Sequence, residues 1–355
     1  MKDNFYKNKK ILITGANGFK GTWLSLWLKI LGSKVYGIGL KKHDNFFSKR
    51  IYINDKIKFY DLDIRKFKNL NKLIKKIKPE IVFHLAGQPL VFEAYKDPIT
   101  TFEINSNGTL NVLEACNRVG SVKTLLCITS DKSYQNNNTK RPYKETDTIM
   151  GDDPYSASKS SAEIIINSYQ KTLKRDNLGI VVARAGNVIG GGDFSENRII
   201  PDLVRSILGK KKIILRNPRA TRPWQHVLDP LHGYLTLAEK NYINHKKFTG
   251  AYNFGPEISQ TINVLGVCKS FLKNWKSTIS IKIIKENINE HEKLVLSIEK
   301  SKQKLKWKPL YSVITSISKT CEWYRDVFVN KRNTSKITKN QLYHYAKGTK
   351  FKFDL

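Results

Sequence analysis

Residues 14–21 read Thr14-Gly15-Ala16-Asn17-Gly18-Phe19-Lys20-Gly21, and they connect the apolar run Lys10–Thr14 to a helical pattern over Phe19–Leu31. The three glycines do different work: Gly15 permits a tight turn, Gly18 lets the backbone approach a pyrophosphate, and Gly21 lets the helix pack closely on the strand. The N-terminus of the helix then points at the phosphate charge. Alone the glycines would indicate only a turn, but between a strand and a helix they predict a dinucleotide site.

The alternation of strand and helix patterns continues to about residue 186. Apolar runs predict strands, and a 3.6-residue period predicts helices. Strands that are apolar on both faces belong to a parallel sheet covered by helices. We therefore predict an α/β fold, a doubly wound parallel Rossmann sheet over residues 1–186. Its other strands are expected at Ser33–Ile38, Ile57–Asp61, Glu80–Leu85, Val122–Thr129 and Gly179–Arg184, and its other helices at Phe67–Ile77, Thr101–Val119 and Tyr155–Lys174.

The regular alternation of strand and helix patterns ends after residue 186. A smaller, mixed α/β substrate-binding lobe is expected over residues 187–330, interleaved with the sheet domain around 225–256, where Ala251–Gly255 would return to the sheet. Residues 331–355 form a basic tail without clear periodicity, which predicts a partly ordered segment. Short strands are expected at Lys212–Arg216 and Ile279–Ile284, helices at Arg198–Leu208, Pro230–Tyr242 and Ile262–Trp275, and exposed aromatic rings at Tyr343, Tyr345, Phe351 and Phe353.

The composition is that of a folded, basic protein. Of the 355 residues 40% are hydrophobic, which excludes wholesale disorder, and the four scattered cysteines exclude a disulfide scaffold or a zinc knuckle. We expect no secretory signal and no membrane span, and hence a cytoplasmic protein. The net charge of +33 would suit a polyanion, but the excess is mostly lysine spread along the chain. We therefore expect no nucleic-acid partner, only attraction of an anionic small substrate.

Tyr155 and Lys159 stand one helical turn apart on one face of a predicted helix. An ammonium beside a phenol favours the phenolate, so we expect Lys159 to lower the pKa of Tyr155, which would act as a base. Ser130 ends the fifth predicted strand, at the edge where open α/β sheets bind ligands. Asp131 and Lys132 follow it directly. Simple hydride transfer needs neither group, so they indicate additional proton transfers or, alternatively, a surface salt pair.

The sequence leaves the choice of dinucleotide open. Gly37–Lys42, at the end of the second predicted strand, lacks the acid that reads the ribose 2′-hydroxyl of NAD. Lys41 and Lys42 would suit the 2′-phosphate of NADP. Asp63, after the third predicted strand, is expected either to meet the adenine amino group or to be a solvated loop acid.

The chain resembles the extended short-chain dehydrogenase/reductases and, within them, the CDP-glucose 4,6-dehydratases. This resemblance implies an NAD-dependent lyase that converts CDP-glucose to CDP-4-keto-6-deoxyglucose and forms a homodimer or a higher homo-oligomer. Gly87 is a departure, because the family usually has a second alanine there. The shared stretches are Thr14–Gly21, His84–Val91, Thr129–Tyr134, Asp153–Lys159, Arg184–Asp193 and Asn217–Pro230.

The resemblance also implies residue roles. Oxidation of sugar C4 by NAD⁺ would be assisted by Tyr155, Lys159 and Ser130. Asp131 would protonate the departing 6-hydroxyl, and Lys132 would assist removal of the C5 proton. No metal ligand is expected, and His226 is alternatively a structural histidine. Cofactor contacts are implied for Gly15, Asn17, Gly18, Phe19, Lys20, Gly21, Asp63, Ile64, Leu85, Ala86, Gln88, Tyr155 and Lys159, and substrate contacts for Gln88, Asn187, Arg198, Arg222 and His226.

Three other functions stay open at this point. A dehydratase for another nucleotide sugar would share every motif named above. A nucleotide-sugar 4-epimerase would not need Asp131 and Lys132. A non-catalytic Rossmann protein that senses NAD(H) or binds nucleic acid would not need Ser130, Tyr155 and Lys159, which are all present.

Overall fold

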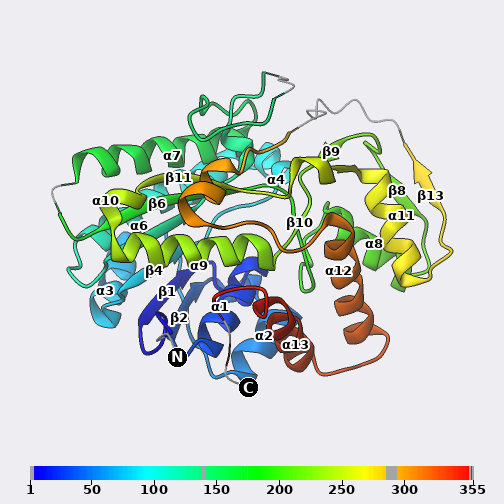
Figure 1. Ribbon diagram of the computed structural model, residues 1–355, viewed down its shortest axis with the longest axis horizontal. Coiled ribbons are helices and arrows are strands. Elements are labelled where there is room, and N and C mark those ends of the chain that lie inside the picture. Colours follow the sequence, from blue (N-terminus) through cyan, green and yellow to red (C-terminus); the bar gives the residue numbers. More distant parts are fainter. Residues whose placement is uncertain (1–3, 138–140, 174, 285–293, 352, 354–355) are drawn as a thin grey trace.

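The computed structural model describes residues 4–137, 141–173, 175–284, 294–351 and 353. Its centre is a seven-stranded sheet in the order β11-β6-β5-β4-β1-β2-β3, with every neighbouring pair parallel (Figure 1). The predicted doubly wound parallel sheet is confirmed. Its order reverses between β1 and β4, which opens a crevice at the carboxyl ends of these strands. The strands are β1 (Lys10–Thr14), β2 (Lys34–Gly39), β3 (Lys58–Asp61), β4 (Ile81–His84), β5 (Thr124–Ile128), β6 (Gly179–Ala185) and β11 (Gly250–Phe254).

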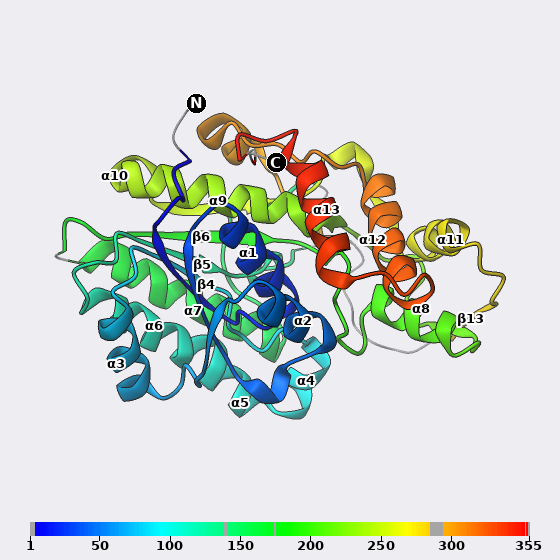
Figure 2. The ribbon, with the colours of Figure 1, turned by 90° about the horizontal axis from the view of Figure 1, so that it is seen from below.

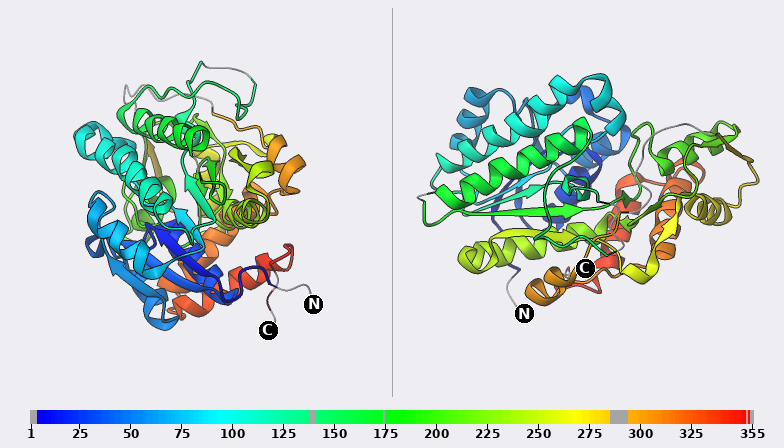
Figure 3. Two further views of the ribbon diagram at one scale, coloured as in Figure 1. Left: turned by 90° about the vertical axis from the view of Figure 1, so that its left-hand side faces the viewer. Right: turned by 90° about the horizontal axis from the view of Figure 1, so that it is seen from above.

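Helices cover both faces of the sheet, as Figure 2 and Figure 3 show. Successive strand residues point to opposite faces, so Ile11 and Ile13 pack into one core while Leu12 packs into the other. Trp23 and Trp27 of α1 fill the first core, and both are fully buried. One face carries α3 (Phe67–Ile77), α6 (Gly108–Asn117) and α7 (Pro154–Thr172), and the other carries α1 (Phe19–Ile30), α9 (Leu228–Ile243) and α10 (His245–Phe248).

The predicted helix Thr101–Val119 is wrong in its bounds and its regularity. Helix α5 (Pro98–Phe102) begins earlier, because the side chain of Asp97 accepts a 3.0 Å hydrogen bond from the backbone N–H of Thr100 and so caps it. A π-helical turn, η2 (Glu103–Asn107), then leads into α6. The predicted helix Tyr155–Lys174 becomes α7, and Lys174 lies outside the described residues. The remaining elements before β5 are η1 (Lys41–His43), α2 (Phe46–Asn54) and α4 (Val91–Lys96).

A smaller group of elements stands beside the carboxyl edge of the sheet (Figure 1). Helix α9 and strand β11, which both lie within residues 225–256, instead pack in the layers of the sheet. The division of the chain into two domains stays a prediction. The group contains β7 (Val188–Ile189) paired with β10 (Gln225–His226), β9 (Thr221–Arg222) paired with β12 (Ile262–Asn263), β8 (Ile213–Leu215) paired with β13 (Ile281–Ile283), and helices α8 (Ile199–Leu208), α11 (Val264–Trp275) and α12 (Val313–Phe328). Of the short turns, η3 (Asp131–Ser133) packs against α7, η4 (Ile258–Gln260) precedes β12, and η5 (Ser301–Leu305) packs against α9 and β11.

The prediction of a partly ordered tail with exposed rings is wrong. Residues 334–346 form helix α13 (Thr334–Ala346), in which Leu342 and Tyr345 are buried in the core. Phe351 is buried as well and packs against Tyr6, with 5.7 Å between ring centroids. The Tyr345 hydroxyl donates a 2.7 Å hydrogen bond to Oδ1 of Asp229 on α9. The tail is ordered by this tertiary contact, which local periodicity does not reveal.

We expect Tyr345→Phe to lower the free energy of unfolding by about 1–3 kcal/mol, because buried Asp229 then keeps only backbone donors such as the N–H of Leu310. Urea denaturation measures this loss. Tyr343→Phe, half-buried on the same helix, is the matched control. Equal losses in the two variants would contradict the role of the Asp229 hydrogen bond.

Candidate active site

The turn between β1 and α1 has the backbone geometry of a phosphate-binding turn. Gly15 adopts φ of +68°, and a Cβ there would lie 2.7 Å from the backbone nitrogen of Ala86, so only glycine fits. A Cβ on Gly21 would overlap the carbonyl oxygen of Gly15. Gly18 is the N-cap of α1, and neither a side-chain cap nor an acidic residue stands in the first turn. The N-terminus of α1 can therefore receive an anion.

Asn17 connects this turn to the loop after β2. Its Nδ2 donates to the carbonyl oxygen of Leu40 at 2.8 Å and to Oδ1 of Asp44 at 2.7 Å. Asp44 is an acid that the sequence analysis did not consider, because η1 separates it from the end of β2. Its carboxylate is held against the phosphate-binding turn by Asn17.

Phe19 and Lys20 begin α1. Phe19 packs at the edge of the core, beside Gly190. The pKa of Lys20 is lowered to about 8, mainly by burial and also by the charges of Arg198 and Lys159, while Asp131 opposes the shift. Lys20 therefore lies within Coulombic range of the predicted catalytic groups.

Asp63 and Ile64 follow β3. Asp63 binds Arg65, whose Nη2 donates to Oδ2 at 2.8 Å. Burial raises the pKa of Asp63, but the hydrogen bonds and charge of Arg65 outweigh it, so this pKa is lowered overall. Ile64 is buried in the core under α6. The adenine contact predicted for Asp63 stays a prediction.

The loop after β4 is fixed by its own side chains. The N–H groups of Leu85 and Ala86 donate to the carbonyl and hydroxyl oxygens of Thr14, which tie the loop to β1. The amide side chain of Gln88 bonds to Leu90 and Thr101, so it is already occupied within the protein. Its predicted cofactor and substrate contacts stay predictions.

Asn105 is a positioning residue that the sequence analysis missed. Its Oδ1 accepts from the N–H of Gln88 at 2.9 Å, and its Nδ2 donates to Oγ of Ser158 at 2.9 Å. It therefore joins the β4 loop to α7 from the middle of η2. A π-helical turn inside a helix is a common mark of a functional site.

Ser130 and Asp131 lie just after β5, where Ser130 caps η3, and they are buried, 6% and 4% exposed. The Ser130 hydroxyl donates to Oδ1 of Asp131 at 3.1 Å, whereas Oδ2 of Asp131 is buried and has no partner among the described residues. Burial raises the pKa of Asp131, and the charges of Lys132 and Arg222 oppose this shift. Asp131 is thus a carboxyl group held toward its protonated form, and the half-buried Lys132 lies next to it.

Tyr155 and Lys159 lie on the first turns of α7. The helix begins there because Asp153 caps it, accepting from the N–H of Tyr155 at 2.9 Å, and Pro154 follows. Burial raises the pKa of Tyr155, and a hydrogen bond with Ser130 opposes the increase. Burial dominates in the protein chain itself, and the expectation that Lys159 lowers the pKa of Tyr155 stays a prediction. Burial also lowers the pKa of Lys159, to about 8, although Glu163 opposes the shift.

Gly87 makes room for Lys159. A Cβ on Gly87 would lie 2.7 Å from Nζ of Lys159 and 2.9 Å from Oδ1 of Asn105. The departure from the usual alanine thus lets the ammonium group lie directly against the β4 loop.

A buried ion pair fixes α7 to the sheet. Nη2 of Arg184 on β6 donates to Oε2 of Glu163 at 2.5 Å, and both side chains are 5% exposed. The Thr129 hydroxyl donates to Oε1 of the same carboxylate at 2.6 Å, and Arg184 also donates to the Tyr134 hydroxyl at 2.7 Å. Glu163 lies one turn beyond Lys159, so the pair also fixes the helical face that carries Tyr155 and Lys159.

The predicted substrate residues occupy two environments. Arg198 pairs with Asp193 at 3.0 Å and lies within Coulombic range of Tyr155, and Arg222 lies within Coulombic range of Asp131. Asn187 follows β6 at the same edge of the sheet. His226 differs, because it is fully buried between Trp23 and Tyr311 and burial lowers its pKa to about 3. This environment fits the alternative of a structural histidine, and the role of His226 in substrate binding stays a prediction.

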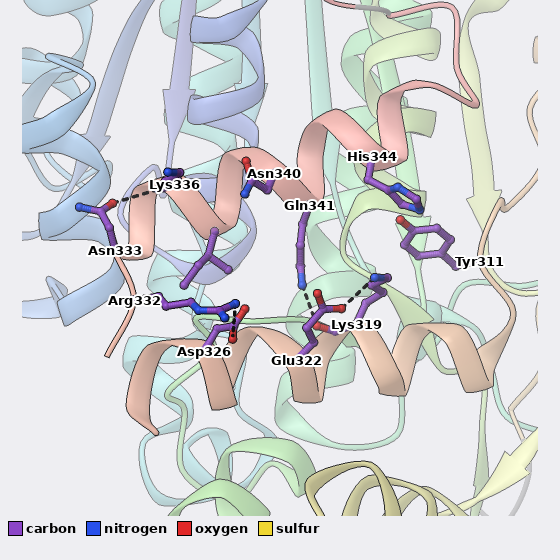
Figure 4. Close-up of a pocket in the computed structure, with 11 residues that line it drawn as sticks. Tyr311, Lys319, Glu322, Asp326, Arg332, Asn333, Lys336, Asn340, Gln341 and His344 are labelled. Carbon is purple, nitrogen blue, oxygen red and sulfur yellow. Dashed lines mark hydrogen bonds and ion pairs between the residues drawn. The ribbon is translucent and has the colours of Figure 1, made fainter. Parts of the chain in front are cut away.

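A cleft of about 660 Å³ lies away from these residues, between α12 and α13 (Figure 4). Ion pairs between Lys319 and Glu322 and between Arg332 and Asp326 line it. None of the residues predicted for catalysis or binding lines this cleft, so we place the chemistry at the edge of the sheet. Across the described ranges, no three His, Cys, Asp or Glu side chains gather as metal ligands, and no helix is long and apolar enough to span a membrane.

Comparison with known proteins identifies the family. Residues 12–320 match the family model described as GDP-mannose 4,6 dehydratase. The chain belongs to this family. A curated dehydratase of the family's reaction type, the CDP-glucose 4,6-dehydratase of Salmonella typhimurium, is 37% identical over 332 residues, which cover 91% of this chain and 92% of that protein. The dTDP-D-glucose 4,6-dehydratase of Dictyostelium discoideum is 30% identical, covering 74% of this chain and 62% of that protein.

Solved structures show the same fold. The UDP-glucose 4-epimerase of Thermotoga maritima, determined with UDP-glucose, superposes with a TM-score of 0.80 at 22% identity, over 89% of this chain and 99% of that one. The dTDP-glucose 4,6-dehydratase of Bacillus anthracis, determined with NAD, gives 0.77 at 22% identity, over 90% and 97%. Because epimerases and dehydratases superpose equally well, the fold does not separate the two reactions.

We expect Glu163→Ala to lower the free energy of unfolding by about 3–5 kcal/mol, because it leaves the guanidinium of Arg184 buried and unpaired. The double variant Glu163→Met/Arg184→Met should lose less than this single variant, because neither charge is then stranded. Denaturant unfolding compares them. The single variant Arg184→Met completes the comparison. If the double variant lost as much free energy of unfolding as Glu163→Ala and Arg184→Met lose in sum, the two charges would not act as a pair.

Proposed function

We propose that the protein is an NAD-dependent CDP-glucose 4,6-dehydratase, a hydro-lyase that forms CDP-4-keto-6-deoxyglucose. The observation that carries this proposal is the buried Oδ2 of Asp131 beside Ser130 and Tyr155, an oxygen without a partner in the part of the chain that the structure describes. A 4-epimerase needs a base and a hydride acceptor but no acid for a leaving hydroxyl. The choice of CDP-glucose rests on the 37% identical Salmonella enzyme.

The residues present fit a dinucleotide. The cradle of Gly15, Gly18 and Gly21, which a Cβ would fill, suits a pyrophosphate at the N-terminus of α1. Asp44 favours NAD over NADP, because its carboxylate would repel a 2′-phosphate. Bound NAD⁺ would accept hydride from C4 of the sugar and return it to C6, so the cofactor would be regenerated each cycle. The other predicted contacts of the cofactor are Asn17, Phe19, Lys20, Asp63, Ile64, Leu85, Ala86, Gln88, Tyr155 and Lys159.

Tyr155 and its neighbours would carry out the first proton transfer. The Tyr155 phenolate would take the proton of the 4-hydroxyl while Ser130 hydrogen-bonds to O4. Since burial of Lys159 gives it a pKa of about 8, this residue is mostly protonated at pH 7 and its charge can stabilise the phenolate. Above pH 8 that charge is lost, so oxidation at C4 should slow.

Asp131 and Lys132 would carry out the elimination. The C5–H bond breaks as the amine of Lys132 takes the proton, and the electron pair of that bond forms the C5–C6 double bond. Lys132 would return this proton to C5 when hydride reaches C6. The C6–O bond breaks at the same time, and the Asp131 carboxyl transfers its proton to that oxygen, which leaves as water. The raised pKa of Asp131 supports this role, because a protonated carboxyl is the form that can donate.

The cations at this edge suit the diphosphate of the substrate. Arg222 offers a guanidinium fork, which binds phosphate oxygens bidentately, and Arg198 and Asn187 lie on the neighbouring segments. All four cysteines are buried free thiols, which supports our proposal that the enzyme works in the cytoplasm.

We expect Asp131→Asn to separate the two half-reactions with CDP-glucose. The amide keeps the shape of the side chain but cannot donate the proton, so formation of 6-deoxy product should fall about 10²–10⁴-fold. Oxidation at C4 should continue, and borodeuteride trapping with mass spectrometry should reveal a 4-keto-glucose species. Tyr155→Phe should instead form no 4-keto species. Wild-type 6-deoxy production by Asp131→Asn would exclude Asp131 as the acid.

We further propose that the enzyme forms a homodimer through α5, α6 and α7. These helices pack together on one face of the sheet (Figure 2), and they carry apolar side chains on their outer surface. Ile99 is 74% exposed, Ile164 is 63% exposed, and Phe102 and Leu110 are each 38% exposed. Single exposed apolar residues are common, but four on adjoining helices form a patch that a second copy would cover.

We expect Ile164→Asp to shift the protein toward a monomer, because it introduces a charge into this patch. Ile243→Asp, at the end of α9 on the opposite face, is the matched control because Ile243 is 69% exposed. Sedimentation velocity over a concentration series measures the effect. Identical sedimentation of both variants and the wild type would reject this interface.

A further inference from the structure

The free oxygen of Asp131 faces a surface that has no polar side chain. A Cβ built on Gly186 would lie 3.1 Å from Oδ2 of Asp131 and would overlap Cγ of Pro223. Oδ2 therefore lies beside the bare Cα of Gly186, next to the ring of Pro223. Neither residue carries a side-chain donor, which explains why this buried oxygen has no partner among the described residues.

Backbone pairing fixes this surface. Gly186 directly follows β6, and Pro223 lies between β9 and β10. The N–H of Gln225 donates to the carbonyl oxygen of Asn187 at 3.0 Å, which starts the pairing of β7 with β10. The two residues are thus held together by the strands that follow them.

Several charged or titratable groups face Asp131 from the elements around it. Lys20 on α1, Lys132 in η3 and Arg222 on β9 all favour the carboxylate, whereas burial favours the neutral acid. Tyr155 on α7 is the remaining titratable neighbour, and the charge of Asp131 raises its pKa. Burial dominates, since the pKa of Asp131 is raised overall in spite of three nearby cations.

We propose that Gly186 and Pro223 form an apolar wall that positions Asp131 as the proton donor of the elimination. The inference rests on the proposed function. Gly186 leaves space for the carboxyl group, and the Pro223 ring keeps water from Oδ2. Both are positioning residues, because they act through Asp131 and not on the reacting atoms.

Pro223→Ala tests the wall directly. Removing the ring opens a path for water, which solvates the carboxylate and should lower the pKa of Asp131 by about one unit or more. Carbon-13 titration of labelled aspartate carboxyls reads this pKa without substrate, and the Asp131→Asn spectrum assigns the signal. The alkaline limb of 6-deoxy product formation should shift to lower pH by the same amount. An unchanged titration of Asp131 in folded Pro223→Ala protein would overturn the proposal.

Gly186→Ala tests the space beside the carboxyl group. Its methyl group should displace Oδ2, and a displacement of about 1 Å costs about 10²-fold in the rate of elimination. Trapped 4-keto-glucose should accumulate, because Tyr155 and Lys159 are not touched. Gly120→Ala is the matched control, since a Cβ there meets nothing within 4 Å. Wild-type elimination by Gly186→Ala would overturn the positioning role.

A double variant separates displacement from misfolding. In Gly186→Ala/Pro223→Ala the overlap with the ring is relieved, while the 3.1 Å approach to Oδ2 remains. It should unfold at a higher urea concentration than Gly186→Ala and still eliminate slowly; recovery of wild-type elimination would contradict the inference. If the wild-type enzyme makes no 6-deoxy product from CDP-glucose, the proposed function fails, and the carbon-13 titration still decides whether the wall acts on Asp131.

Discussion

The ion pair between Glu163 and Arg184 joins the helix of the reactive groups to the sheet. Parallel strands bring their carboxyl ends to one edge, but the sheet does not by itself determine how α7 is rotated against that edge. The pair does so, because Arg184 projects from β6 and Glu163 lies one turn beyond Lys159. Thr129 binds the same carboxylate from the end of β5, next to Ser130. This buried contact therefore positions the helical face of Tyr155 and Lys159 against the strand end that leads to Ser130 and Asp131, together with the Asn105–Ser158 hydrogen bond.

Burial gives the site its chemistry. In water a carboxyl group is ionised and an ammonium is charged at neutral pH. Here burial raises the pKa of Asp131 and lowers the pKa values of Lys20 and Lys159 to about 8. The pKa values of the carboxyl group and of the two ammonium groups are therefore closer to one another than they are in water. This convergence suits a reaction that removes one proton and delivers another within one site.

Much of the fold was predictable from local patterns. Strand β1 and helix α3 have the predicted bounds, because alternation and a 3.6-residue period arise from nearby residues. Ser130, Asp131 and Tyr155 were also predictable, since a strand end and a helix start define the edge of the sheet. Asn105 was not, because its role depends on a π-helical turn that brings it to Gln88. Asp44, Gly87 and the burial of His226 likewise depend on contacts between segments far apart in the chain.

Both ends of the described chain contribute to one core. Tyr6 lies before the first strand and donates to the carbonyl oxygen of Leu235, while its ring packs on Phe351. Leu342 and Tyr345 fill the same core beside Trp27. During synthesis on the ribosome this core stays incomplete until about 345 residues have followed Tyr6. The N-terminal strands must therefore wait for this late segment, and Trp27 stays incompletely covered until it arrives.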